Sequence, residues 1–146
     1  MLLKEYAKGK RAFTRVTLRG RELQVIAPNL ENSNLSRACL FQIGLMQANL
    51  KNCNLSQAQL RLANLTGADL SNANLTSADL CRADLSKSDL KNACLAAANL
   101  VEAKLIAADL SGADLRGANL SQADLRSAIF FQTIMPDGTI HNSNCS

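Results

Sequence analysis

The chain of 146 residues is poor in the residues that carry most catalytic and membrane chemistry. It has no Trp, one Tyr, one His and two Pro, and only 3% of its residues are aromatic. A single His leaves little material for acid–base catalysis or for a histidine metal site. No apolar run approaches the roughly 18 residues of a membrane helix, so no membrane span is predicted. We therefore expect no enzyme, no cofactor, no bound metal and no small-molecule substrate.

The first residues and the cysteines bear on location. The start, MLLKEYAKGK, lacks the continuous apolar segment of a secretory signal. The five cysteines include no C-x-x-C pair of the kind that binds zinc. An odd number of thiols without a secretory signal predicts a reducing cytoplasm. These cysteines are Cys39, Cys53, Cys81, Cys94 and Cys145.

A five-residue repeat occupies most of the chain. From Leu30 to Leu125 all twenty positions divisible by five are Leu, and Phe130 follows in step. The residue two before each Leu is nearly always small, as Ala48 is, and the residue between them is usually Asn or Asp. The unit is A-[D/N]-L-x-x. A repeat this regular has to be interpreted before any other motif.

A period of five excludes an amphipathic α-helix. Five residues turn a helix by about 500°, so Leu at this spacing would wind around every face. In a strand, residues two apart share a face, so Ala48 and Leu50 are expected on the same side. The next small residue, Cys53, lies an odd three steps later and stays inside only if the chain bends. Each repeat therefore predicts one short extended side and a corner, and the chain coils around its own Leu and Ala side chains.

Outward residues indicate how many sides make one coil. Polar residues recur every twenty positions in two sets, which are Asn32, Asn52, Asn72 and Asn92, and Asp69, Asp89 and Asp109. Four repeats per coil would stack each set in a column along the rod, where Asn amides can hydrogen-bond to one another. The alternative is that Asn is simply frequent in this sequence.

The A-[D/N]-L-x-x array resembles the pentapeptide-repeat protein family over about residues 11–130. The resemblance implies an all-β fold, a right-handed quadrilateral β-helix with four repeats per coil. The start LLKEYAKGKRAF and the later MPDGT resemble cyanobacterial members of that family. Some members resemble B-DNA in shape and charge and bind DNA gyrase, which confers quinolone resistance.

The repeat is interrupted upstream of Leu30. Phe13, Leu18 and Leu23 are five apart, but Leu23 and Leu30 are seven apart. We interpret the difference as a register break at residues 24–29 near Pro28, because Pro lacks the N–H of a regular strand. Three early repeats and the later run would together make about six coils.

Both ends of a solenoid need a cover, because they would expose apolar side chains and unpaired strands. Leu2, Leu3, Tyr6 and Ala7 cluster at helical spacing before Gly9, which predicts a short N-terminal capping helix. At the other end, the Pro136-Asp137-Gly138 turn signal and a bulky apolar group predict a cap over the last coil. This group consists of Phe130, Phe131, Ile134 and Met135. The alternative is that the group forms the contact of an end-to-end homodimer, so the chain is expected to be a monomer or such a dimer.

These signals divide the chain into three parts. Residues 1–10 are expected to form the N-terminal cap and residues 11–130 the β-helix. Residues 131–146 are expected to form a C-terminal cap and a flexible tail that contains the single His141.

The net charge of +4 comes from the N-terminal part. Residues 30–130 carry nine basic and nine acidic side chains, whereas residues 1–29 carry seven basic residues against two Glu. These basic residues are Lys4, Lys8, Lys10, Arg11, Arg15, Arg19 and Arg21. They predict either a site for an anionic partner or a solvated cap. No aromatic stacking platform accompanies them, which disfavours nucleic acid.

The repeat consumes almost the whole chain, so the leading hypothesis is a non-enzymatic rigid scaffold or protein-interaction module. Two alternatives stay open, a DNA-mimic modulator of DNA gyrase or topoisomerase and the binding of an anionic partner through the basic segment. A neutral rod disfavours the first, since mimicry of DNA needs a strongly acidic surface. Outward apolar residues are candidates for contact with another protein. Phe41, Leu62 and Val101 would share one side of the rod, and Met46 and Ile106 the next.

Overall fold

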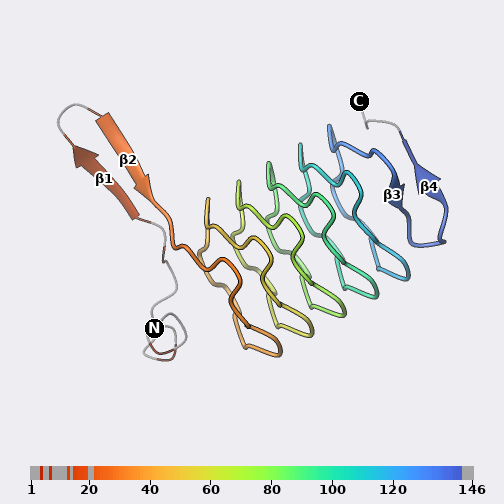
Figure 1. The fold of residues 1–146 in the computed structure, drawn as a ribbon, viewed down its shortest axis with the longest axis horizontal. Coiled ribbons are helices and arrows are strands. Elements are labelled where there is room, and N and C mark those ends of the chain that lie inside the picture. Colours follow the sequence, from red (N-terminus) through yellow and green to blue (C-terminus); the bar gives the residue numbers. More distant parts are fainter. Residues whose placement is uncertain (1–3, 5–6, 8–12, 14, 20–21, 143–146) are drawn as a thin grey trace.

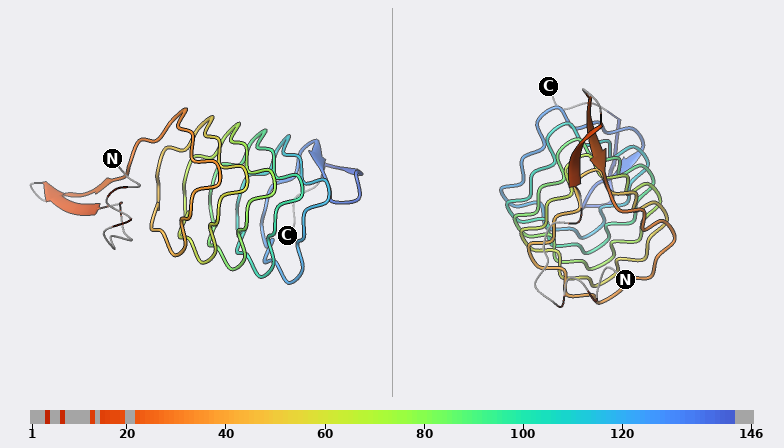
Figure 2. Two further views of the ribbon diagram at one scale, coloured as in Figure 1. Left: turned by 90° about the horizontal axis from the view of Figure 1, so that it is seen from below. Right: turned by 90° about the vertical axis from the view of Figure 1, so that its left-hand side faces the viewer.

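The computed structural model describes Lys4, Ala7, Phe13, residues 15–19 and residues 22–142. From Asn29 onward the chain winds into a stack of coils (Figures 1 and 2). Parallel β-bridges join residues twenty apart, from Asn29–Asn49 at one end to Asp114–Ile134 at the other. Twenty residues, or four repeats, therefore make one coil, and the stretch from 29 to 134 makes about five coils.

Each corner is a β-turn formed by the two residues after a Leu. In the turn after Leu55, the Ala58 N–H donates to the Leu55 carbonyl at 3.1 Å, and Gln57 has a φ of 57°. A positive φ at the third residue is what a type II turn requires. A positive φ is found at eighteen non-glycine corner residues, Gln57 among them, and at Gly67, Gly112 and Gly117. A non-glycine residue in this region costs about 1–2 kcal/mol, so the corners are maintained by the packing around them.

The Asn or Asp before each Leu helps to close the turn. Asn54 Oδ1 accepts a hydrogen bond from the Ser56 N–H at 3.1 Å, and Asp69 Oδ1 accepts one from the Ser71 N–H at 3.0 Å. This is an Asx turn, in which a short polar side chain replaces a backbone acceptor. The sequence predicts that these residues face outward, but it does not by itself reveal that they hold the bend.

The Leu and small residues form the core. The Leu residues at every fifth position from Leu40 to Leu115 are at most 1% exposed, and Cys53 is 1% exposed, as its inward position in the repeat predicts. The Cys53 thiol donates to the Leu30 carbonyl, and burial raises the pKa of this thiol. Phe13 and Phe130 pack against the two ends of this core.

The N-terminal part differs from the predicted repeats. The strands β1 (Arg15–Arg19) and β2 (Glu22–Ile26) pair antiparallel, with Leu18 opposite Leu23, and the hairpin projects beyond the first coil (Figures 1 and 2). The predictions of three early repeats with a register break at residues 24–29, and of a sixth coil, are therefore wrong. Neither Leu18 nor Leu23 follows an Asn or Asp or has a small residue two positions before it. Without an Asx turn to bend it, this alternating sequence stays extended.

At the other end β3 (Thr133–Ile134) and β4 (Ile140–His141) form a short antiparallel hairpin. The predicted Pro136-Asp137-Gly138 turn lies between them, with a φ of 85° at Gly138, whose N–H donates to the Met135 carbonyl. His141 was expected in a flexible tail. It lies in β4 instead, because β4 pairs with β3, and its ring contacts Phe130 edge-on at 5.4 Å between centroids.

The predicted C-terminal apolar group divides between inside and outside. Phe130 is 2% exposed and Met135 packs against the core, whereas Phe131 is 59% exposed. Phe130 takes the inward Leu position of the repeat, so its neighbour falls on the outward position. The expectation that Phe131 covers the last coil is therefore wrong, and Ile134 is half-buried.

Several predictions concern residues that the structure does not describe. The capping helix and the N-terminal part at 1–10 lie outside the described residues except for Lys4 and Ala7, and Cys145 lies outside them as well. The division of the chain into three parts stays a prediction. In the described part, no helix has the length and apolar character needed to cross a membrane.

Candidate interaction surfaces

Phe41, Leu62 and Val101 belong to one side of the rod. Bridges join Cys39 to Gln59 and continue in the same column to Asp79, Asn99 and Asn119, and we call this side the Phe41 side. Phe41 is 40% exposed and Leu62, in the next coil, is 42% exposed. Val101 lies further along the same side and is half-buried. The repeat thus places these three residues as the sequence predicts, with the most exposed pair in adjacent coils.

Met46 and Ile106 lie on the next side. Their column follows the bridges from Gly44 through Asn64 and Asp84 to Lys104, so three coil steps separate the two residues. Both side chains are half-buried. They make no continuous apolar surface with each other, although Met46 lies one corner away from Phe41 in the first coil.

Leu62 is unusual among the corner residues. Every corner between residues 30 and 133 has a residue with positive φ at the third position of the turn. Leu62, with a φ of 58°, is the one large apolar residue among them. Neither its backbone conformation nor its exposed side chain benefits the fold. The sequence repeat points to this position as outward, but only the backbone shows that Leu there is unfavourable for stability.

Charged residues on the Phe41 side pair with one another. Arg82 Nε lies 2.7 Å from Glu102 Oε2, and Arg61 lies 3.8 Å from Asp79. Hydrogen bonding to Glu102 raises the pKa of Arg82, and the same contact lowers the pKa of Glu102. The two exposed apolar residues are therefore set among ion pairs and not among charges of one sign.

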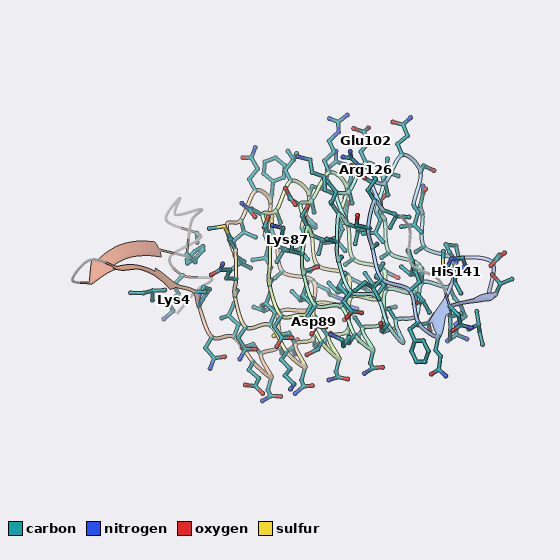
Figure 3. All side chains as sticks on the ribbon, turned by 90° about the horizontal axis from the view of Figure 1, so that it is seen from above. Lys4, Lys87, Asp89, Glu102, Arg126 and His141 are labelled. Carbon is teal, nitrogen blue, oxygen red and sulfur yellow. The ribbon has the colours of Figure 1, made fainter. Side chains whose placement is uncertain are left out.

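The acidic column at Asp69, Asp89 and Asp109 is offset by a lysine. The bridges stack these residues, and Lys91 Nζ lies 2.9 Å from Asp109 and 3.2 Å from Asp89. Hydrogen bonds to both carboxylates raise the pKa of Lys91. Burial favours a higher pKa for Asp109, but hydrogen bonds from Ser111 and Lys91 outweigh it and lower that pKa. The labelled charges Lys87, Asp89 and Glu102 are spread over the outside of the rod (Figure 3).

The predicted column of Asn residues is stacked along the rod, but few hydrogen bonds join its side chains. Asn52 Nδ2 donates to Asn32 Oδ1 at 3.1 Å, and beyond Asn92 the column continues with Gly112. Asn92 Oδ1 fills the space beside that glycine, only 2.3 Å from where a Cβ would stand.

The basic segment can be placed only in part. Lys4 is exposed, and Arg15 and Arg19 lie in β1. Lys8, Lys10, Arg11 and Arg21 lie outside the described residues. Across the described part of the chain, no group of three or more His, Cys, Asp or Glu side chains is placed to hold a metal ion, and Cys39, Cys53, Cys81 and Cys94 are free thiols.

Comparison with known proteins identifies the family. The family described as pentapeptide repeats (8 copies) matches this chain over residues 45–80, 63–100 and 98–135. The chain belongs to the pentapeptide-repeat family. Its fold is thus the right-handed quadrilateral β-helix of that family. No curated protein matches the sequence.

Three solved pentapeptide repeat proteins are similar to this chain. One from the Arabidopsis thaliana thylakoid lumen is 30% identical, with a TM-score of 0.50 over 75% of this chain and 70% of that one. HetL, involved in heterocyst differentiation regulation in the cyanobacterium Nostoc, is 38% identical, with a TM-score of 0.41 over 77% of this chain and 60% of that one. Rfr23 from the cyanobacterium Cyanothece is 32% identical, with a TM-score of 0.47 over 69% of this chain and 82% of that one.

Proposed function

We propose that this pentapeptide-repeat protein is a non-enzymatic scaffold that binds another protein through the Phe41 side. The observation that supports it most is the pair of exposed apolar side chains, Phe41 and Leu62, in adjacent coils of one side. Such a pair, set among ion pairs, has the composition of a small protein contact with an apolar centre and a polar rim. Val101 extends this surface along the rod, and Met46 and Ile106 flank it.

The backbone makes this surface rigid. The Leu62 N–H donates to the Cys81 carbonyl at 3.1 Å, and the Gln42 N–H donates to the Arg61 carbonyl at 2.9 Å. Each coil of this side is thereby held to the next, so little conformational entropy is lost when a partner binds. Leu62 has a corner conformation and an exposure that both disfavour Leu. Contact with a partner gives a reason for an apolar side chain at that position.

The two alternative functions have less support. A DNA mimic needs a strongly acidic rod, but residues 30–130 carry equal numbers of basic and acidic side chains, and Lys91 bridges two members of the acidic column. Binding of an anionic partner through the basic segment stays a prediction, as does a cytoplasmic location.

The test is affinity capture from the native cell extract followed by binding of the purified partner. The wild-type chain is compared with a Phe41→Glu/Leu62→Glu double variant. We expect one partner to bind the wild-type protein and to bind the double variant at least tenfold more weakly, because two desolvated contacts become charged. An Ala97→Glu variant, exposed on a different side of the rod, is the matched control and is expected to bind normally.

Two outcomes would contradict the proposal. Equal binding by the wild-type protein and the double variant would remove the Phe41 side as the contact. Reproducible catalytic turnover by the purified chain, lost on heat unfolding, would show that the protein is an enzyme and not a scaffold alone.

A further inference from the structure

The last coil of the rod is covered on two of its four sides. On one side the Leu110 N–H donates to the Ile129 carbonyl at 2.9 Å, and on the next the Leu115 N–H donates to the Ile134 carbonyl at 2.8 Å. The other two sides, residues 119–127, have no such cover among the described residues. We call residues 119–127 the open half-coil.

The open half-coil presents backbone groups that are paired one coil earlier. There the Leu105 N–H donates to the Asp124 carbonyl at 2.8 Å, and the Ala103 carbonyl accepts from the Asp124 N–H at 2.9 Å. The equivalent groups of the open half-coil, the Leu125 N–H and the Ala123 carbonyl, have no partner among the described residues. The N–H groups left open in this way are those of Leu120, Gln122, Leu125 and Ser127. Unpaired backbone groups at a strand edge are a template for another strand.

The side chains of the open half-coil indicate what a covering strand must carry. Leu105 and Ala103 are at most 1% exposed because the next coil covers them, whereas Leu125 and Ala123 are only partly buried. Burial of this apolar surface favours a segment that lays an aliphatic side chain over Leu125 and a small one over Ala123. The two positions are separated by one residue, as they are in the repeat itself.

Ion pairs between coils indicate which residue belongs between the small and the aliphatic one. Lys91 Nζ lies 2.9 Å from Asp109 Oδ2, and Arg61 Nη1 lies 3.8 Å from Asp79 Oδ2. In both pairs, a basic residue directly after one Leu reaches the acidic residue directly before a Leu of the next coil. A carboxylate at this position of a covering strand would therefore meet any basic residue that follows the Leu beneath it.

Arg126 is such a basic residue, because it follows Leu125. Its side chain is 76% exposed, and it turns back to its own coil, with Nη2 2.6 Å from Asp124 Oδ2. Arg116 also turns back, to Asp114 at 2.6 Å, and the position that it would reach in the next coil is Ile134, which has no carboxylate. Arg126 can bridge Asp124 and an acidic residue of a covering strand, as Lys91 bridges two Asp residues.

The end of the chain itself does not match this chemistry. Residues 143–146, Ser-Asn-Cys-Ser, include neither an aliphatic nor an acidic residue. The matching occupant is thus a segment from outside this chain.

We propose that the open half-coil binds an extended segment of a different protein, with a small, an acidic and an aliphatic residue in succession, as an added strand. The four open N–H groups supply main-chain hydrogen bonds for affinity, and Leu125 and Arg126 supply the choice of side chains. The site lies at the opposite end of the rod from Phe41 and Leu62, so this proposal does not depend on the scaffold contact.

Hydrogen exchange of the full chain tests the site with a synthetic decapeptide, ANLSSADLSS. At millimolar peptide the four open amides are expected to exchange roughly tenfold more slowly. The Gly117 amide, already bonded to the Pro136 carbonyl, should not change. A peptide with both leucines replaced by serine should protect none of them. The Phe41→Glu/Leu62→Glu double variant should bind the decapeptide like the wild type, which separates this test from that of the scaffold contact.

A charge reversal tests the role of Arg126. A decapeptide with Lys in place of its Asp is expected to bind the wild-type chain roughly fivefold more weakly, and Arg126→Glu should reverse this preference. Arg116→Glu is the matched control, because Arg116 is also exposed and paired within its own coil but lies beneath Ile134. It should keep the wild-type preference.

Three results would overturn the proposal. One is unchanged exchange of the four open amides at millimolar decapeptide. Another is equal affinity of the Asp and Lys peptides for the wild-type chain. The third is protection of these amides that appears on raising the concentration of the chain alone, because a second copy would then be the occupant.

Discussion

Truncation of one core Leu in the middle of the rod should be far more costly than truncation of its equivalent at the open end. Leu75 is fully buried, and Leu55 and Leu95 lie in the coils before and after it. Its N–H donates to the Cys94 carbonyl at 2.7 Å, and the Leu55 N–H donates to the Asn74 carbonyl at the same distance. These bonds fix the spacing of the coils, so the neighbours cannot close in on a cavity.

The magnitude follows from burial and cavity formation. In Leu75→Ala the loss of three buried carbons costs about 2.4 kcal/mol at ~0.8 kcal/mol for each. A cavity that does not collapse brings the total loss of unfolding free energy to roughly 3.5–5 kcal/mol. In Leu120→Ala the side chain is already partly exposed and the space opens to water, so we expect a loss of about 1 kcal/mol.

Urea unfolding followed by far-ultraviolet circular dichroism measures both variants. The chain has no Trp, so the backbone signal is the suitable probe. Nearest-neighbour coupling predicts that the mid-rod variant also broadens the transition, because a weakened coil divides the stack. Equal losses of free energy for Leu75→Ala and Leu120→Ala would refute the idea that the coils form a continuous, tightly spaced core.

Three further predictions concern the corners and the Asx turns. Gly117→Ala should lower the unfolding free energy by about 1 kcal/mol, which is the cost of a positive φ in a non-glycine residue. Gly112→Ala should lower it by more, because the new Cβ would also displace Asn92 Oδ1. Equal losses for the two variants in urea unfolding would contradict this reasoning. Leu62→Gly should raise the melting temperature by relieving the same cost, and an unchanged or lower value would count against corner strain. Acidification should destabilise the rod, because the pKa of Asp109 is lower in the folded state than in the unfolded chain. The stabilisation from the charged Asp109 carboxylate is complete above the unfolded-state pKa of about 4 and is lost as pH falls through the folded-state pKa. Asp109→Asn keeps an acceptor for the turn but does not titrate, so it should lose less stability than the wild type between neutral pH and pH of about 3, and equal losses would exclude this role.

The sequence identifies the candidate surface because the repeat assigns each residue an inward or outward position. Phe41, Leu62 and Val101 share a column of the rod whatever the details of packing, as the bridges of the Phe41 side confirm. The repeat alone does not give exposure. Phe41 and Leu62 are exposed, whereas Met46 and Ile106, which are also outward in the repeat, are half-buried.

The sequence by itself determined the repeating core, since a Leu every fifth residue with a small residue two before it is compatible only with a chain that bends at each repeat. It did not determine the ends. A five-residue spacing of Phe13, Leu18 and Leu23 looked like the repeat, but β1 and β2 pair with each other because nothing there closes a turn. Only the tertiary structure showed that the C-terminal hairpin covers half of the last coil, because which edge remains unpaired depends on where distant segments meet in space.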